Sequence, residues 1–495
     1  MNAPLQKRYD AVVVGAGPNG LAAAITLVDA GLSTLLVERA DTPGGGARSS
    51  EVTLPSFIHD VCSAVHPLAL CSPFFRTLDL GRHGLTWIHS PYALTHILND
   101  GSTAVLERSV EATAERLRRD RHEYLALMRP WVDHAEELFE MFLGPLHFPA
   151  QPLLYARFGL AAIQSMKTLA WRHFVERSTS ALLAGIAAHG TVRLDAAASS
   201  SFALMLAIAG HHAGWPIARS GSRALADALV SHYRSLGGEL LLHRNVSRIS
   251  ELPSARAYLF DISPTALISI AEGRLSGCYE RRLARFRYGP GVFKVDWALR
   301  EPIPWRAPEC RQSITVHLAG DLEQIAAAIR AAREGRMAER PFVLLAQPSL
   351  VDPSRAPQGK HTAWAYCHVP HGDSTNVLDA IEAQIERHAP GFREVILARS
   401  TRNAIEMEHY DPNYVGGDIN AGSSDLKQLF FRPVAKLDPY ATSAADIFLC
   451  SSSTPPGGGV HGMCGYWAAQ SALKKRFGRE ALSIATEARA WPQVS

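Results

Sequence analysis

Three glycines near the start of the chain have the spacing of a dinucleotide-binding turn. Gly15, Gly17 and Gly20 form the pattern Gly-x-Gly-x-x-Gly directly after an apolar run. Gly15 allows a tight turn, Gly17 lets the backbone approach a pyrophosphate, and Gly20 lets the next helix approach the preceding strand. Glu38, at the end of the following apolar run, is placed to accept hydrogen bonds from an adenosine ribose. The spacing predicts an adenine dinucleotide site.

A second glycine cluster helps to choose between the dinucleotides that use such a turn. The segment Pro43-Gly44-Gly45-Gly46-Ala47-Arg48 follows Glu38 closely. Its glycines bring main chain near a second stretch of cofactor, and Arg48 can pair with a phosphate. The long FAD molecule needs this extension and NAD does not, so the segment favours FAD.

A third glycine-rich turn lies near the end of the chain. Residues 451–462 read Ser-Ser-Ser-Thr-Pro-Pro-Gly-Gly-Gly-Val-His-Gly, between an apolar run and a predicted helix over 462–476. A helix N-terminus suits the N1/C2 carbonyl edge of an isoalloxazine, which becomes anionic on reduction. Successive glycines also permit main chain to approach a flat ring. We therefore expect one FAD to be held by both ends of the chain.

The elements that must position these turns alternate between strand and helix. A buried strand over 9–14, a helix over 21–30 closed by Gly31 and a strand over 33–37 form a right-handed parallel βαβ unit. The predicted fold class is α/β, with a Rossmann-like FAD-binding domain on a parallel sheet and a substrate domain with a mixed sheet and helical cap. Further strands are predicted at 239–243, 292–299, 342–347, 362–369 and 446–450, a hairpin at 94–98 and 103–106, and helices over much of 109–210 and at 221–236.

These segments resemble a known group of proteins. The N-terminal unit with its Gly-Gly sequel resembles the two-dinucleotide-binding-domain flavoproteins, which include amine oxidases and phytoene desaturases. The segment 453–465, Ser-Thr-Pro-Pro-Gly-Gly-Gly-Val-His-Gly-Met-Cys-Gly, resembles the phytoene desaturase-like branch. Together with 288–296 and 414–419, it is most similar to the phytoene dehydrogenase-related, or pyridine nucleotide-disulfide oxidoreductase domain-containing, subgroup.

The resemblance implies a discontinuous FAD-binding domain. It assigns 1–60, 215–290 and 440–495 to that domain and 61–214 and 291–439 to the substrate-binding and cap domain. A backbone group near Val246 is expected to meet the adenine. The expected cofactor-binding residues are Gly15, Gly17, Pro18, Asn19, Gly20, Glu38, Arg39, Gly45, Gly46, Ala47, Arg48, Val246, Ser453, Pro456, Gly458, Gly459, Val460 and His461.

The chain departs from its relatives at several positions. Along 56–62 Asp60 is retained, but two family glycines are missing, so this strip is expected to have a different contour. Ser451 to Ser453 replace an acidic residue of the amine oxidases, and Cys450 and Cys464 do not match their covalent flavin cysteine. We therefore expect non-covalent FAD. Without Cys-x-x-Cys or a second Gly-x-Gly-x-x-Gly unit, neither a dithiol nor a nicotinamide site is predicted, and reduction by a pyridine nucleotide would need an unrecognised route.

Composition excludes several other classes of protein. The 495 residues predict two or more domains, and a net charge of +3 without a dense basic block predicts no nucleic-acid partner. Seven widely spaced cysteines and a polar start indicate a reducing compartment without a secretory signal: the cytoplasm, or the mitochondrion in a eukaryotic cell. Residues 142–174 mix aromatics, leucines and basic residues, which predicts a cap helix and leaves peripheral membrane contact open. A homodimer is also left open.

Single catalytic residues are harder to predict, because a flavin carries most of the chemistry of hydride transfer. His461 can touch flavin or substrate, although a helix-start histidine can equally face solvent. Lys294 and Asp296 share one face of a strand, as an active-site pair or, as we favour, a structural salt bridge. His211 and His212 lack partners at ligand spacing, so no metal is expected.

The leading functional hypothesis is dehydrogenation of a hydrophobic small molecule, a carbon–carbon desaturation with hydride transfer to flavin N5. Oxygen or a quinone would then accept the electrons. Three alternatives remain open: amine oxidase-like C–N oxidation, a redox-neutral flavin-dependent isomerisation, and a flavin-holding interaction protein with little turnover.

Overall fold

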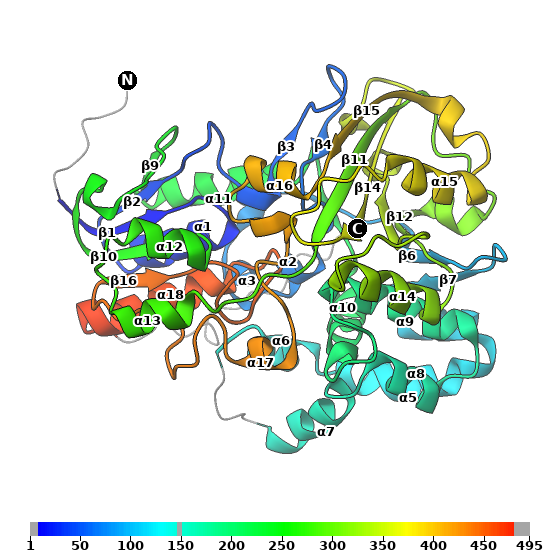
Figure 1. Cartoon of the computed structure of the whole chain (residues 1–495), viewed down its shortest axis with the longest axis horizontal. Coiled ribbons are helices and arrows are strands. Elements are labelled where there is room, and N and C mark those ends of the chain that lie inside the picture. The colour runs from blue at the N-terminus through cyan, green and yellow to red at the C-terminus, as the bar shows by residue number, and fades with distance from the viewer. Residues whose placement is uncertain (1–7, 146–150, 480–495) are drawn as a thin grey trace.

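The computed structural model describes residues 8–145 and 151–479, and it contains two sheets (Figure 1). The first is a parallel sheet of five strands, in the order β16-β10-β1-β2-β9. It lies at the left of Figure 1, with α1 and α18 packed against each other beside it. Its strands are β1 (Arg8–Val14), β2 (Thr34–Val37), β9 (Glu239–Leu241), β10 (Ser254–Phe260) and β16 (Ile447–Leu449).

Short apolar runs form the centre of this sheet because both of its faces are covered. Every residue of β2 and β16 is buried, as are the last four residues of β1 and of β10. The strands come from three separate parts of the chain, so the parallel sheet is discontinuous in sequence. The exact boundaries expected for the FAD-binding domain stay a prediction, and 1–7 and 480–495 lie outside the described residues.

The second sheet is mixed and has seven strands, in the order β15-β11-β14-β13-β12-β6-β7. Its pairs are antiparallel except β12 with β6, which is parallel. The strands are β6 (Tyr92–Ile97), β7 (Thr103–Leu106), β11 (Gly291–Leu299), β12 (Ser313–Leu318), β13 (Val343–Ala346), β14 (His361–Val369) and β15 (Ile396–Arg402). Two small pairs, β3 (Ser49–Ser50) with β4 (His59–Asp60) and β5 (Trp87–Ile88) with β8 (Ile217–Ala218), lie outside both sheets.

Helices surround both sheets, and a group of them forms the layer below the mixed sheet in Figure 1. Within this layer α9 contacts β6 and β7 directly and packs against α10. The layer comprises α4 (Val110–Arg116), α5 (Arg121–Val132), α6 (Ala135–Phe142), α7 (Pro152–Ala162), α8 (Met166–His173), α9 (Arg177–Ala187), α10 (Ser199–Ala213) and α14 (Leu322–Arg333). The other helices are α1 (Pro18–Asp29), α2 (Pro67–Cys71), α3 (Pro73–Thr77), α11 (Arg223–Ser235), α12 (Pro264–Ile270), α13 (Gly277–Leu283), α15 (Leu378–His388), α16 (Ala404–Tyr410), α17 (Leu426–Phe430) and α18 (Met463–Ala472).

The predicted fold class is therefore confirmed, and so are the elements on which it rested. The N-terminal βαβ unit and the hairpin of β6 and β7 form as expected, and Ser109 caps α4 by accepting a hydrogen bond from the Ala112 N–H. The predicted helix over 462–476 ends its α-helical part at Ala472. The strands β10, β12 and β15 were not predicted. Among the described residues, no helix combines the length and the apolar character needed to cross a bilayer.

Candidate functional site: one cavity between two glycine turns

The first and last glycine turns of the chain touch each other. The Asn19 side chain donates a hydrogen bond from Nδ2 to the Ser452 hydroxyl at 3.0 Å. Gly465 of α18 packs so closely on α1 that a Cβ at this position would lie 1.8 Å from the Asn19 carbonyl oxygen. The two turns open into a single cavity of about 1440 Å³, lined among others by Gly15, Gly17, Gly458 and Gly459. Segments more than 400 residues apart in the chain thus form one site.

The local geometry of the first turn explains its glycines. Gly15 has a φ of +100°, a value that residues with a side chain rarely adopt. A Cβ on Gly20 would lie 1.9 Å from the Gly15 carbonyl oxygen, so only glycine lets α1 begin this close to β1. A Cβ on Gly17 would lie 2.8 Å from the Asp261 carboxylate. The turn therefore leaves its main chain open toward the cavity, which is the arrangement a pyrophosphate needs.

Asp261 is a site residue that we did not predict. It follows β10, lines the cavity, and accepts a hydrogen bond from the Gly20 N–H at 2.8 Å. Burial raises its pKa to about 7, although the Gly20 hydrogen bond opposes this shift. The sequence did carry a signal, since Tyr258-Leu259-Phe260 is an apolar run that ends directly in an acidic residue.

Glu38 and Arg48 lie together at the end of β2. The Glu38 carboxylate accepts hydrogen bonds from the Ala16 and Ala40 N–H groups, each at 2.8 Å, and pairs with Arg48 at 3.4 Å. The Arg48 guanidinium also lies over the Tyr410 ring, 5.6 Å from its centroid, and its Nε has no hydrogen-bond partner among the described residues. Glu38 thus holds the first turn to the end of β2. Contacts of Glu38 with a ribose and of Arg48 with a phosphate stay predictions.

The last glycine turn leads into α18 through His461. Gly457, Gly459 and Gly462 all have positive φ values, and Gly462 is the N-cap of the helix. The His461 Nδ1 accepts a hydrogen bond from the Met463 N–H at 3.0 Å, and its carbonyl accepts one from Ser72 at 2.6 Å. Its Nε2 is buried without a partner among the described residues. The alternative that His461 faces solvent at this helix start is therefore wrong.

Burial also sets the protonation state of His461. The side chain is 1% exposed, and burial lowers its pKa to about 4, so the ring is neutral near pH 7. Because Nδ1 accepts a hydrogen bond, the single proton resides on Nε2. His461 therefore presents an N–H donor at the cavity wall.

The cysteines near this turn are thiols rather than thiolates. Cys464 donates weak hydrogen bonds to the Thr454 and Gly457 carbonyls, and burial raises its pKa to about 12. Burial raises the pKa of Cys450 as well. All seven cysteines are free. A covalent flavin–sulfur bond needs a reactive thiolate, which neither residue supplies.

Nearly all residues predicted from sequence to bind the cofactor line this cavity. Those that do are Gly15, Gly17, Pro18, Asn19, Glu38, Arg39, Gly45, Gly46, Ala47, Arg48, Val246, Ser453, Pro456, Gly458, Gly459, Val460 and His461. Gly20 is not at the wall and acts through the approach of helix to strand that was expected of it.

Lys294 lies apart from the lining residues. Its Nζ pairs with Asp296 at 2.5 Å and lies 5.3 Å from the centroid of the Trp364 ring, which does line the cavity. Asp296 is also 3.5 Å from the His59 Nδ1, but burial lowers the pKa of His59 to about 4 and leaves it neutral. This geometry favours the structural salt bridge over direct contact with a ligand, and a catalytic role of Lys294 stays a prediction.

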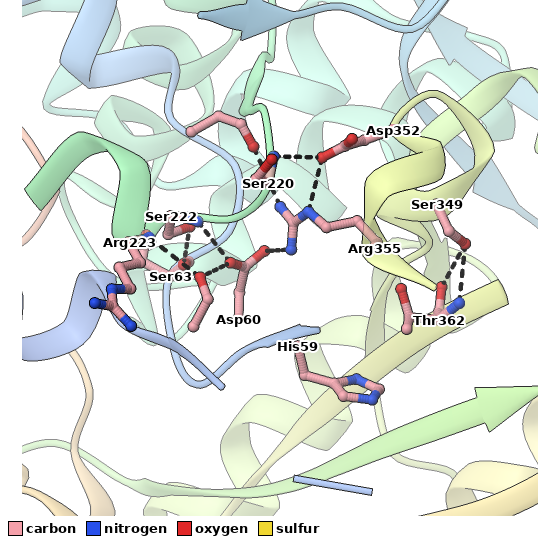
Figure 2. A network of polar contacts seen from close by, with 12 residues as sticks. His59, Asp60, Ser63, Ser220, Ser222, Arg223, Ser349, Asp352, Arg355 and Thr362 are labelled. Carbon is pink, nitrogen blue, oxygen red and sulfur yellow. Dashed lines mark hydrogen bonds and ion pairs between the residues drawn. The ribbon is translucent and has the colours of Figure 1, made fainter. Parts of the chain in front are cut away.

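The strip at 56–62, where family glycines are missing, leads into a buried charge network (Figure 2). The Arg355 guanidinium bridges Asp60 and Asp352, each at 2.9 Å. Asp60 also accepts hydrogen bonds from the Ser222 N–H and the Ser49 hydroxyl, each at 2.7 Å. Burial alone would raise the pKa of Asp60, but Arg355 and these hydrogen bonds outweigh it and hold the pKa below its usual range. His59 points away from this network.

Most of the remaining wall of the cavity is apolar. Its walls come from the helical layer and from the strands of the mixed sheet. They include Phe142, Phe158, Phe202, Met205, Leu206, Trp215, Leu344, Trp364 and Tyr366. His211 lies elsewhere, where Tyr124 bonds its Nε2 at 2.7 Å, and the described residues contain no cluster of three or more side chains suited to a metal ion.

The chain thus combines a parallel nucleotide-type sheet with a mixed sheet and a shared cavity, and solved structures of oxidoreductases have a similar fold. Residues 13–72 match the family described as NAD(P)-binding Rossmann-like domain. A solved structure of putrescine oxidase bound to putrescine has a TM-score of 0.60 and 16% identity, and the match covers 95% of this chain and 99% of that one.

Two curated relatives match along nearly the whole chain. Pyridine nucleotide-disulfide oxidoreductase domain-containing protein 2 of Mus musculus is 27% identical over 94% of this chain and 93% of its own. Phytoene desaturase (lycopene-forming) of a Paracoccus species is 24% identical over 94% of this chain and 97% of its own. These matches confirm the resemblance found in the sequence. Along nearly its whole length the chain is therefore similar to the phytoene desaturases and to this domain-containing group.

Proposed function

We propose that this protein is an FAD-dependent dehydrogenase that binds its flavin non-covalently and oxidises a hydrophobic small molecule. The observation that carries the proposal is the shared cavity, in which Asn19 of the first turn bonds Ser452 of the last. A cofactor held by only one turn would not require the two ends of the chain to meet.

The residues present fit FAD in three respects. The cavity of about 1440 Å³ reaches both turns, so it can take an elongated dinucleotide and a substrate. Glycines stand where a Cβ would meet backbone or carboxylate atoms, as at Gly17 and Gly20. Buried polar atoms without a protein partner, the Arg48 Nε and the His461 Nε2, belong to residues of the wall. FAD, when bound, supplies a ring that accepts a hydride at N5.

The chain's own residues then divide the remaining tasks. The N-terminus of α1 with Gly15 to Asn19 would face the phosphates of a bound FAD, and α18 with Val460 and His461 would supply a helix N-terminus and a neutral ring beside it. Neutral thiols at Cys450 and Cys464 leave the flavin unattached. The apolar wall excludes water from the substrate and strengthens the remaining electrostatic contacts.

Desaturation of a carbon–carbon bond is the reaction that the apolar lining supports best. Such a substrate offers few polar groups, and binding to the aromatic and aliphatic wall comes from removal of apolar surface from water. Oxygen or a quinone is the proposed electron acceptor.

Amine oxidation is a second candidate, favoured by one observation. The Trp364 and Tyr366 rings of β14 both line the cavity and are nearly parallel, 8° apart, with centroids separated by 6.1 Å. Paired aromatic rings are suited to a neutral amine, and the putrescine oxidase of the same fold is described with putrescine bound.

Anaerobic titration of the purified protein tests these proposals. The protein should be yellow, and heat or acid should release FAD into the supernatant, as expected for a non-covalent cofactor. The bound flavin is then exposed to polyenes, to amines and to NADPH, and the loss of its visible absorbance is followed.

Each outcome has a defined meaning. Bleaching by polyenes supports desaturation, and bleaching by amines alone supports the second candidate. Rapid bleaching by NADPH would contradict the proposed electron source, and an isomerase would convert its substrate only after reduction by an external reagent. A colourless protein that does not take up FAD would overturn the proposal.

A further inference from the structure

One wall of the otherwise apolar cavity carries polar groups without a protein partner. Thr315 of β12 and Trp364 of β14 line the cavity and are 1% and 4% exposed. Neither the Thr315 hydroxyl nor the Trp364 indole N–H has a hydrogen-bond partner among the described residues. Both residues pair with Ala346 of β13, so they stand in the same row across the mixed sheet.

A histidine pair extends this polar wall. His189 borders the cavity, and its Nε2 is 3.1 Å from the Nε2 of the fully buried His317. His317 lies two residues after Thr315 and therefore on the same face of β12. Burial lowers the pKa of His189 to about 3 and lowers that of His317 strongly, so both rings are neutral. Two neutral rings in Nε2–Nε2 contact share a single proton between them.

The surroundings of His317 indicate which ring holds that proton. His317 Nδ1 has no partner among the described residues and faces Gly185, where a Cβ would be 2.7 Å away. His96 Nδ1 faces the same glycine at 2.8 Å, and His96 must be bare at Nδ1 because its Nε2 donates to the Gly320 carbonyl at 2.7 Å. A buried N–H facing a glycine Cα would lose its hydrogen bond, whereas a lone pair tolerates a C–H neighbour.

The proton of the pair therefore belongs to His317 Nε2, which donates to His189 Nε2. His189 must then carry its own proton on Nδ1, the nitrogen that makes no hydrogen bond to any described residue. Residues of this wall thus carry an imidazole N–H in His189, an indole N–H in Trp364 and a hydroxyl in Thr315, and the last two are buried without a partner among the described residues. The imidazole and indole N–H groups can only donate a hydrogen bond, whereas the hydroxyl can either donate or accept one.

We propose that this wall is a subsite for a carbonyl oxygen, so that the substrate is an apolar molecule bearing a ketone or a related carbonyl and not a pure hydrocarbon. The inference rests on the proposed function for the reaction, which it deepens by naming the substrate class. A carbonyl oxygen accepts two hydrogen bonds, and its chain fills the apolar part of the cavity. Buried donors discriminate strongly against a ligand that leaves them unpaired.

A matched pair of probes tests the subsite without requiring turnover. The FAD-loaded protein is equilibrated with 2-undecanone or with undecane, and headspace gas chromatography measures the bound fraction and the dissociation constant of each. The quantity compared between variants is the preference, Kd of the alkane divided by Kd of the ketone. Differences in hydrophobicity between the probes cancel in this comparison.

Three variants separate the polar groups from their surroundings. His189→Phe keeps a ring but removes the N–H, and Thr315→Val removes the hydroxyl with little change in shape. Thr362→Val is the matched control, because Thr362 is also 1% exposed with an unpartnered hydroxyl but is not among the lining residues. We expect the preference for ketone to fall about tenfold in His189→Phe and about fivefold in Thr315→Val, the loss typical of a buried hydrogen bond. Thr362→Val should change it less than twofold.

The results distinguish this inference from the proposed function. An unchanged preference for ketone in both His189→Phe and Thr315→Val would overturn the subsite. An equal loss of affinity for ketone and alkane would overturn it as well, because the residues would then only shape the cavity. FAD content and circular dichroism show whether each variant is loaded and folded. If His189→Phe does not fold, Thr315→Val still tests the subsite. A yellow protein bleached by a substrate, but with no ketone preference, would leave the proposed function standing and reject only the subsite.

Discussion

Polar side chains at the cavity wall determine which hydrogen bonds this protein can make to a ligand. His461 is 1% exposed and Asp261 is partly buried, and burial shifts their pKa values in opposite directions, to about 4 and about 7. In both cases the shift favours the neutral form. The cofactor cavity is thus built to present neutral donors and acceptors in a low-dielectric setting, where each hydrogen bond to a ligand counts for more than in water.

Asp261 should make the apoprotein less stable at alkaline pH. Its folded-state pKa of about 7 lies above the ordinary value of 3.8, so the folded state holds the proton more tightly than the unfolded state. Stability therefore falls as pH rises from about 4 to about 7. We expect Asp261→Asn to equal the wild type near pH 4 and to exceed it by about 2 to 4 kcal/mol at pH 8. Urea unfolding of the apoprotein at both pH values measures this, and a parallel shift at the two values would contradict it.

His461 has two separable tasks, which two substitutions should resolve. Its Nδ1 caps α18 through the Met463 N–H, and its Nε2–H is buried without a partner among the described residues, on a residue that lines the cavity. His461→Ala removes both and should cost about 1 kcal/mol of stability, the loss of a helix cap, together with about tenfold in FAD affinity. His461→Asn can still cap the helix through Oδ1, but its amide N–H lies near the position of the histidine Cδ2 and does not reach that of Nε2, so it should recover stability and not affinity. Thermal unfolding and FAD fluorescence titration give the two values. Recovery of both by asparagine would reject the second task.

At the scale of elements, the charge network of Asp60, Arg355 and Asp352 joins three parts of the fold (Figure 2). Asp60 ends β4, Ser222 precedes α11, and Arg355 ends the short 3-10 turn Pro353–Arg355 that leads toward β14. Arg355 is fully buried, as is Asp60. Asp60 therefore ties β4 to the segment before α11 and to the turn before β14, and it is not among the residues that line the cavity.

Arg355→Met should be strongly destabilising, because it leaves two carboxylates buried without their cation. We expect a loss of about 3 to 5 kcal/mol at pH 7. The loss should shrink as pH falls, since protonation removes the unpaired charges. Arg223→Met is the control: its exposed pair with Asp227 on α11 should be worth less than about 1 kcal/mol. Chemical unfolding at pH 5 and pH 7 measures both stability losses. If Arg355→Met and Arg223→Met lost the same stability, the charge network would not be what holds these parts of the fold together.

Much of this architecture was readable from local sequence, and the exceptions have physical causes. The strands β1, β2, β11 and β14 are mainly apolar and mostly buried, as coverage on both faces requires, and β11 also carries the buried pair of Lys294 and Asp296. By contrast β10 opens with exposed polar residues and only its last four positions are buried, so its central place in the sheet is a tertiary effect. The polar wall could not be predicted, because His189 and His317 are neighbours only after two distant segments fold together.

At the scale of the whole molecule, the site depends on closing the chain on itself. The parallel sheet collects its strands from both ends of the chain, and α18 packs on α1 so that the last turn meets the first. FAD bound in the shared cavity would touch both segments. Its binding energy should then stabilise this closure, in proportion to the logarithm of free FAD over its dissociation constant.

Gly465→Ala isolates the closure from the rest of the fold. The added methyl group would lie 1.8 Å from the Asn19 carbonyl oxygen, so α18 has to move away from α1 and the two turns must separate. We expect at least a tenfold loss of FAD affinity and a stability loss of about 1 to 3 kcal/mol, as for other overpacked sites. Gly277→Ala in α13 is the matched control, because the added methyl group would meet only the flexible end of the Arg281 side chain, at 3.5 Å.

Thermal unfolding with and without FAD measures both effects together. In the wild type and in Gly277→Ala, FAD at one hundred times its dissociation constant should add about 2.7 kcal/mol of stability. At the same FAD concentration, Gly465→Ala should gain markedly less, because its affinity is lower. The circular dichroism of the free Gly465→Ala protein should stay close to that of the wild type, since the mixed sheet and its helices lie away from the clash. If Gly465→Ala bound FAD as tightly as Gly277→Ala does, contact between the two glycine turns would not be required to hold the cofactor, and the central geometric argument for this flavin site would fail.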